Sequence, residues 1–189
     1  MKDNNDMPTS KEMLEVYFLR HGLLFCGASR DFPSLYSVGG DWDAIVSFIE
    51  EGQVFYSKFY KNRVTYLSRE FYANVKQYRQ RIELVSTTAT DIFTFLETVG
   101  TANTKEIKQT LRLSNQSYTN AMLELSKELL VTAIRRDETM NQHWSSFCWG
   151  TWSRWEAEHQ ISDVKISLDR AKELLSGFMS EAKINLILR

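Results

Sequence analysis

Residues 88–152, TATDIFTFLETVGTANTKEIKQTLRLSNQSYTNAMLELSKELLVTAIRRDETMNQHWSSFCWGTW, decide the fold. Three segments repeat apolar residues at helical spacing, and two strand-like segments with a polar turn between them follow. A short turn separates the second helix from the third, so the order is that of a winged helix-turn-helix. In chain order the pieces are residues 89–100, 103–113, 114–131, 131–136, 137–142 and 143–152.

Capping residues mark where these helices begin. Asn103 is followed three residues later by Glu106, which is the arrangement of a capping box. Ser114 is a natural first residue for the third helix. Its apolar positions recur at i, i+3, i+4 and i+7, which predicts one buried face and one face free for a partner. These positions are Tyr118, Ala121, Met122, Leu125 and Leu129.

The rest of the chain predicts further helices around this segment. Ser10, Asp41, Ser68 and Ser167 are expected to cap helices, and a short helix followed by a strand at 63–68 is expected after Gly52. We expect an exposed link after residue 152, and an apolar tail, INLILR, that packs on the body or on a second subunit. The predicted class is α+β, mainly α with a small β-wing. The expected divisions are a flexible terminus at 1–10, a mixed helical subdomain at 11–85, the winged helix at 86–152, and a linker with a C-terminal helix at 153–189.

Composition limits the function classes. The 189 residues carry a formal net charge of -1, which excludes a wholly basic nucleic-acid binder. Cys26 and Cys148 are far apart, so neither a disulfide framework nor a cysteine zinc site is indicated. The polar N-terminus has no apolar signal core, and no apolar run reaches membrane-spanning length. We therefore expect a cytoplasmic protein that does not enter a membrane.

The third helix carries the residues predicted to read DNA. In a winged helix-turn-helix this helix enters the major groove, where Asn and Gln pair with adenine edges. The positions expected to face the groove are Asn115, Gln116, Ser117, Thr119 and Asn120. Cations on neighbouring elements are expected to contact phosphates. These are Lys105, Lys108, Arg112, Lys127, Arg135 and Arg136.

Residues 58–81, here called the basic stretch, are strongly biased in charge. Seven cations stand there against the single acid Glu70, with aromatic residues between them. Cations and rings together suit a surface that follows phosphates. The alternative, which is favoured locally, places the rings in the core and the cations on the solvent side. The cations predicted to add backbone contacts are Lys58, Lys61, Arg63, Arg79 and Arg81.

Charge argues against strong non-specific binding by the predicted winged helix alone. Residues 86–150 hold six Lys and Arg against seven Asp and Glu. Winged helices also serve as protein-docking modules, so a homodimer formed through this segment or through the INLILR tail is an alternative.

Signals for an enzyme are weak. His21, His143 and His159 lack metal-ligand spacing, and no Gly-rich phosphate loop is present. We therefore predict no metal, no cofactor and no catalytic residue. The tryptophans around the second wing strand are interpreted as core packing. They are Trp144, Trp149, Trp152 and Trp155.

Three segments in order resemble a known family. FLRHGLLFCGASRDFPSLYSVGGD (residues 18–41), VFYSKFYKNRVTYLSREFYANV (54–75) and SLDRAKELL (167–175) are similar to the opening, the middle and the closing helix of small bacterial proteins called AlkZ-related. The resemblance covers roughly residues 13–180. The family is named for the AlkZ-type winged-helix DNA glycosylases, which excise alkylated bases, so the resemblance implies a relative of DNA-repair enzymes.

The sequence departs from those glycosylases at the catalytic motif, which is Gln-x-Gln or Gln-x-Asp. Each glutamine of this chain lacks the second partner two residues later. They are Gln53, Gln77, Gln80, Gln109, Gln116, Gln142 and Gln160. Base excision also needs a group that positions the attacking water. The leading hypothesis is therefore a DNA-binding protein, either a regulator or a non-catalytic relative of the repair enzymes.

The enzymatic alternative is a minimal glycosylase. Its site would lie in a cleft between the N-terminal part and the winged helix. Its candidate residues are Asp41, Asp43, Gln77 and Gln80.

Overall fold

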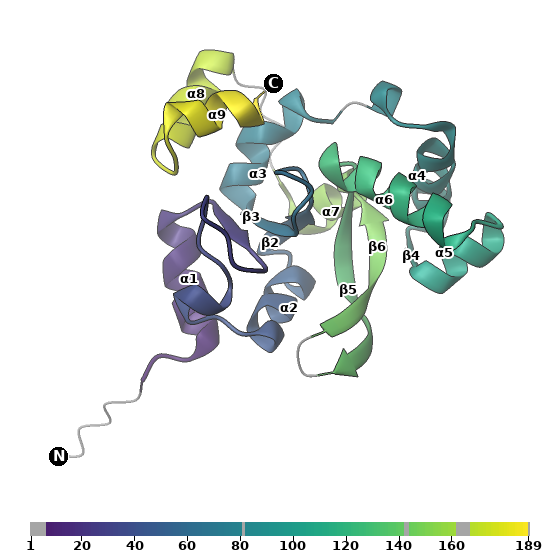
Figure 1. Cartoon of the computed structure of the whole chain (residues 1–189), viewed down its shortest axis with the longest axis horizontal. Coiled ribbons are helices and arrows are strands. Elements are labelled where there is room, and N and C mark those ends of the chain that lie inside the picture. The colour runs from purple at the N-terminus through teal and green to yellow at the C-terminus, as the bar shows by residue number, and fades with distance from the viewer. Residues whose placement is uncertain (1–6, 81, 142–143, 162–166, 189) are drawn as a thin grey trace.

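The computed structural model describes residues 7–80, 82–141, 144–161 and 167–188. Figure 1 shows an α+β protein with two small sheets and helices packed around both. The elements are α1 (Ser10–Arg20), β1 (Leu23–Phe25), η1 (Tyr36–Val38), α2 (Trp42–Glu50), β2 (Val54–Ser57), β3 (Thr65–Ser68), α3 (Arg69–Val75), η2 (Lys76–Tyr78), η3 (Ile82–Leu84), α4 (Thr87–Val99), β4 (Thr101–Asn103), α5 (Thr104–Thr110), α6 (Asn115–Lys127), β5 (Val131–Asn141), β6 (Trp144–Thr151), α7 (Trp152–His159), α8 (Leu168–Ser176) and α9 (Glu181–Ile187).

The N-terminal sheet is antiparallel, has the order β1-β3-β2 and is buried on both faces. Leu24 and Tyr66 pack with α1 and α2, whereas Phe55 and Leu67 pack with α3 and the C-terminal helices. Burial on both faces explains the unbroken apolar run at the start of β2. The short helix predicted after Gly52 is wrong, because a strand occupies this position.

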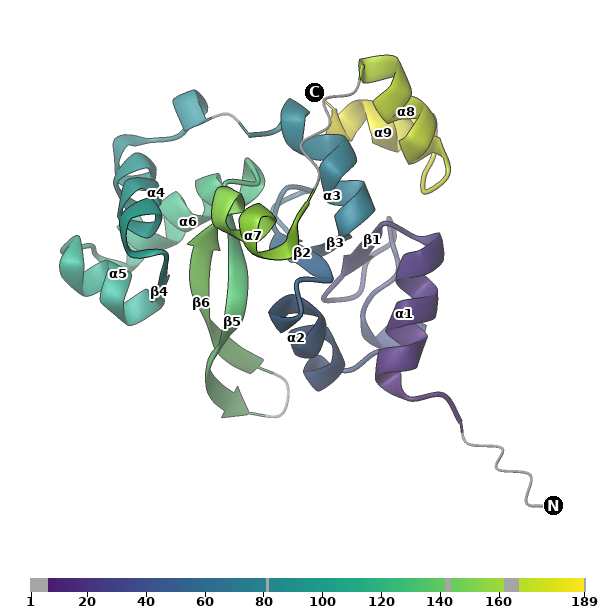
Figure 2. The same cartoon turned by 180° about the vertical axis from the view of Figure 1, so that it is seen from behind.

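The last two helices return to the N-terminal sheet. Figure 2 shows α8 and α9 beside α3, at one end of the molecule. Leu175, Ile184 and Ile187 are buried there against β1 and α3. The INLILR tail is predicted to pack on the body or on a second subunit. In the structure it packs on the body of the same chain.

The second sheet has the order β4-β6-β5, and α4, α5 and α6 enclose a separate apolar cluster beside it. Ile92, Leu96, Ile107 and Leu125 are fully buried in that cluster. Gly100 ends α4 with a φ of 83°, which suits glycine and lets β4 start at the next residue. The three helices lie where the sequence predicts them, and β4 is an addition. The hairpin is also present, but the turn predicted at 137–142 is wrong over 137–141, because β5 continues to Asn141 in pairing with β6.

Direct contacts join the two sheets and fix the hairpin. The Tyr56 N–H on β2 donates to Thr132 Oγ1 on β5 at 2.9 Å. In Figure 1 the β5-β6 hairpin lies between α2 on one side and α4, α5 and α6 on the other. The exposed link predicted after residue 152 is wrong. Helix α7 stands there with Trp155 and Glu156 buried, because both side chains have partners in the N-terminal part.

Several features are absent from the described residues. Within these ranges, no helix has both the length and the apolar character that crossing a membrane requires. Among the same residues, His, Cys, Asp and Glu side chains form no group of three that could hold a metal ion. Cys26 and Cys148 are both free thiols.

Candidate functional site

Helix α6 presents a polar surface over its first turns. Ser114 Oγ accepts a hydrogen bond from the Ser117 N–H at 3.1 Å and so caps the helix, as predicted. Gln116 Nε2 donates to Asn120 Oδ1 at 2.9 Å, which holds the two amides side by side. All five residues expected to face a groove are exposed. They are Asn115, Gln116, Ser117, Thr119 and Asn120.

A tight turn sets the position of α6 relative to α5. Asn103 caps α5 through the predicted capping box with Glu106. Arg112 adopts a left-handed conformation with a φ of 53°, and the Leu113 N–H donates to the Lys108 carbonyl at 2.9 Å. The Lys108 ammonium donates to Asn115 Oδ1. The turn therefore brings a cation to the first residue of α6.

The cations expected near α6 differ in their surroundings. Lys105, Arg112 and Arg135 are exposed, and Lys108 and Lys127 are half-buried. Arg136 is held by acidic residues, because its guanidinium lies 2.8 Å from Asp43 Oδ1 and its backbone N–H donates to Glu50 Oε1 at 2.9 Å. Arg136 therefore fastens the hairpin to α2.

Most cations of the basic stretch have partners within the chain. Lys61 Nζ lies 2.7 Å from Asp31 Oδ2, and this contact lowers the pKa of the Asp31 carboxyl. Arg63 donates to the Gly27 and Ala28 carbonyls. Arg79 donates to the Lys127 carbonyl at the end of α6 at 3.0 Å. Arg81 lies outside the described residues.

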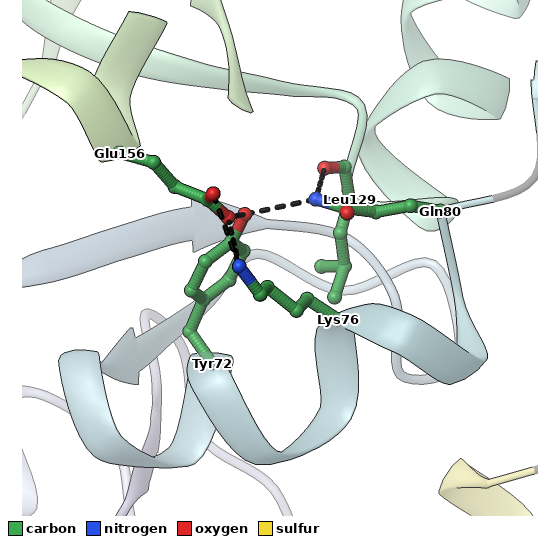
Figure 3. Close-up of polar contacts among 5 residues, drawn as sticks. All are labelled: Tyr72, Lys76, Gln80, Leu129 and Glu156. Atoms are coloured by element: carbon green, nitrogen blue, oxygen red, sulfur yellow. Dashed lines mark hydrogen bonds and ion pairs between the residues drawn. The ribbon is translucent and has the colours of Figure 1, made fainter. Parts of the chain in front are cut away.

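The most deeply buried cation of the basic stretch, Lys76, forms an ion pair that joins α7 to the N-terminal part (Figure 3). Lys76 Nζ lies 3.0 Å from both carboxylate oxygens of Glu156, and the two side chains are 5% and 10% exposed. The Tyr72 hydroxyl donates to Glu156 Oε1 at 2.6 Å and accepts from Gln80 Nε2 at 2.8 Å. Gln80 also donates to the Leu129 carbonyl at 3.4 Å. This network ties three distant segments together.

The four residues proposed for the enzymatic alternative lie apart from one another. Asp41 caps α2, and hydrogen bonds from Ser10 and from the Ala44 N–H lower the pKa of its carboxyl. Asp43 pairs with Arg136, Gln80 belongs to the buried network, and Gln77 is half-buried. The structure does not bring them to one site.

A cavity of about 280 Å³ lies between the N-terminal sheet, α2, α6 and the hairpin. This is the cleft that the enzymatic alternative requires, although none of its four candidate residues lines it. Aromatic rings form most of the wall, with the Tyr56 and Trp149 centroids 5.4 Å apart and those of Trp42 and Phe147 6.1 Å apart. The described residues around the cavity are Cys26, Trp42, Tyr56, Lys58, Val64, Tyr66, Thr104, Tyr118, Thr119, Met122, Ser126, Ser146, Phe147 and Trp149.

The polar groups of this cavity are mainly neutral hydroxyls. Burial raises the pKa of the Tyr56 and Tyr118 hydroxyls above the usual value, and that of Tyr66 well above it, so these phenols are neutral at physiological pH. The Tyr66 hydroxyl interacts with Cys26, and the Tyr118 hydroxyl interacts with Trp149. Lys58 supplies the positive charge. The lining is therefore apolar with several hydroxyl groups and one cation.

This cavity is not apparent from the sequence, which predicts Trp149 in the core and Lys58 on a phosphate-binding surface. The signal was the pairing of aromatic residues on alternate positions, Phe147 and Trp149, with Tyr56 and Tyr66 in distant strands. Only the tertiary fold shows that these rings leave a space.

Comparison with known proteins identifies a family but no individual relative. A family model described as AlkZ related matches residues 30–185. No curated protein and no solved structure matches the chain significantly.

Proposed function

Because the chain belongs to the AlkZ-related family, we propose that it binds duplex DNA through residues 86–152, folded as a winged helix-turn-helix. The family suggests a relative of DNA-repair proteins, acting as a regulator or as a non-catalytic relative of the glycosylases. Helix α6 is the helix that enters the major groove. Residues 11–85 and 153–189 pack together and carry this DNA-binding segment.

The order of elements supports the winged-helix assignment. Helix, strand, two helices and a hairpin follow one another as α4, β4, α5, α6, β5 and β6. The short strand β4 pairs with β6 at the edge of the hairpin, in the order β4-β6-β5. The turn between α5 and α6 is short, as in DNA-binding helix-turn-helix proteins.

The single observation that carries the proposal is the exposed polar surface on the first turns of α6. Gln116 and Asn120 lie one turn apart and hydrogen-bond to each other in the free protein. An amide presents a donor and an acceptor together, and adenine offers the complementary pair in the major groove. Apolar residues of the same helix are buried, so the helix is oriented with these amides outward.

Electrostatics predicts modest rather than strong non-specific affinity. Phosphate contacts come from Lys105, Arg112 and Arg135, which are exposed, with Lys108 and Lys127 beside them. The slight negative charge of this segment offsets them. Arg136 contributes less, because Asp43 already pairs with it.

A salt titration tests the proposal. Binding to a labelled random duplex is measured by anisotropy at several salt concentrations, and the logarithm of the association constant is plotted against that of the salt concentration. Each phosphate contact contributes about -0.9 to the slope. Replacing Lys105 by Ala, or Arg135 by Ala, is expected to reduce the slope by about one.

Lys61→Ala is the matched control, because Lys61 is exposed but already paired with Asp31. Its slope should equal that of the wild type. Absence of binding at low salt would contradict the proposal, and so would equal slopes for all three variants and the wild type.

A further inference from the structure

The aromatic cavity between α6 and the N-terminal sheet has the features of a small-molecule site. Its volume of about 280 Å³ lies just below the roughly 300–1,000 Å³ typical of ligand pockets, which suits a molecule of one or two rings. It reaches the surface, because Thr119 is exposed and Lys58 and Ser146 are half-buried at its wall. A ligand can therefore enter without unfolding the protein.

The wall specifies a flat and largely apolar molecule. Six of the lining residues are aromatic, and they come from α2, from both sheets and from α6. Ring centroids between 5.4 and 6.2 Å apart join Tyr56, Phe147 and Trp149. Rings at such separations interact with an aromatic guest by edge or offset contacts. Val64 and Met122 complete the apolar surface.

The polar groups specify an anionic substituent. Lys58 is the one cation among the described lining residues, and none of these residues is acidic. Lys58 is half-buried at the wall, so its charge is partly shielded from solvent. A cation in such surroundings attracts an anion more strongly than one in bulk water.

We propose that this cavity binds a free, flat aromatic molecule carrying one anionic group, such as an aromatic carboxylate. The ring lies among Tyr56, Phe147 and Trp149, and the anion is held by Lys58. This inference does not require the proposed function, because the ligand binds the protein without DNA.

Naphthalene-2-carboxylate and its carboxamide are the probes, since they share one ring system and differ in charge. Calorimetric titration of the full chain should show the carboxylate binding about tenfold more tightly than the carboxamide, because a charge-assisted hydrogen bond is stronger than a neutral one. In Lys58→Met this preference should vanish, and the carboxamide affinity should stay unchanged. Lys61→Met, a matched control outside the cavity, should behave as the wild type.

Lys58→Gln keeps the test valid if Lys58→Met fails to fold. It leaves a polar side chain at this half-buried position and removes only the charge. The preference for the carboxylate should vanish in this variant too, and the carboxamide affinity should stay unchanged. Equal affinities for the two probes, or no change in either variant, would overturn the inference.

An unstacked base of DNA would bring similar ring chemistry, and the experiment separates the two sources. A duplex containing 2-aminopurine that brightens on binding, together with no heat from either probe, would show that the cavity takes a DNA base. That result would overturn the proposal of a free ligand. It would leave DNA binding through α6 standing, so the failures of the two proposals are distinguishable.

Helix α6 also links the cavity to the proposed DNA surface. Tyr118, Thr119, Met122 and Ser126 of this helix line the cavity, and Thr119 is among the residues predicted to face the groove. If DNA binding holds, saturating naphthalene-2-carboxylate should change the affinity for DNA, and DNA should change the affinity for the probe by the same factor. Identical DNA affinities with and without bound probe would overturn this linkage.

Discussion

The basic stretch and the first turns of α6 use their polar side chains in opposite ways. The basic stretch holds more cations than any other part of the sequence, yet Lys61, Arg63, Lys76 and Arg79 are engaged with carboxylates or backbone carbonyls of the same chain. The first turns of α6 hold no charged residue, but their polar side chains remain exposed. A local excess of charge in a sequence therefore does not establish a charged surface.

The difference follows from what surrounds each region. Residues 58–80 run through loops and short elements whose neighbours expose carbonyl groups, and arginine satisfies these with its several donors. Helix α6 satisfies its own backbone, and its amides hydrogen-bond with one another or with Lys108 while they stay exposed to solvent. Exposed amides are thus better candidates for DNA contacts than internally bonded cations.

The largest expected effect comes from removing the charge of Glu156. Glu156→Gln removes the carboxylate that lies 3.0 Å from the buried Lys76 ammonium, and we expect a loss of about 3–5 kcal/mol in the free energy of unfolding. Denaturant unfolding followed by far-UV circular dichroism measures it. Glu158→Gln is the matched control on the same helix, because its pair with Arg154 is largely exposed, and should cost at most about 1 kcal/mol.

A double variant sharpens that result. Lys76→Met combined with Glu156→Gln removes the buried ammonium as well as the carboxylate. The double variant should therefore be more stable than Glu156→Gln alone. If the double variant is less stable than the single one, the cost comes from lost packing and hydrogen bonds and not from the buried charge.

The next largest effect concerns the amides of α6. Gln116→Ala and Asn120→Ala should each weaken binding to a duplex selected from a random pool by about 1–3 kcal/mol, because a bidentate contact with a base is lost. The melting temperature should not fall, since both side chains are exposed. Gln53→Ala, an exposed amide outside the predicted interface, is the control. Equal losses for all three variants would remove the distinction between α6 and the rest of the surface.

The smallest effect is on the cap that starts α6. Ser114→Ala leaves the Ser117 N–H without its acceptor, and we expect a loss of about 1 kcal/mol in the free energy of unfolding. Ser117→Ala removes a hydroxyl within the same helix, where alanine has the higher helix propensity, so its stability should be equal or higher. Thermal unfolding of the two variants gives the comparison.

Local signals predicted much of the fold. Asp41, Asn103, Ser114 and Ser167 cap helices as expected, because a cap depends only on the next three residues. The predicted exposure of the polar positions on α6 also agrees with the structure.

Non-local partners account for what was missed. The charge of Glu156 suggested that residues 153–160 are exposed. Lys76 and Tyr72, at least eighty positions earlier, make its burial favourable. The apolar run at the start of β2 fits a helix or a strand, and the choice depends on the sheet that covers it. The cavity needs rings from five separate elements, so no stretch of sequence contains it.

The return of α8 and α9 to the N-terminal sheet bears on how the protein is made. On a ribosome the segments from α4 to the start of β5 emerge together, and the buried members of their apolar cluster lie within residues 89–131, with Val85, Trp149 and Trp152 packed at its edge. The cluster behind β1 and β3 includes Leu175, Ile184 and Ile187, so it stays open until those residues have been synthesised. Domains usually form in the order of translation. In this chain we therefore expect the cluster of α4, α5 and α6 to form before the N-terminal cluster, which needs α8 and α9.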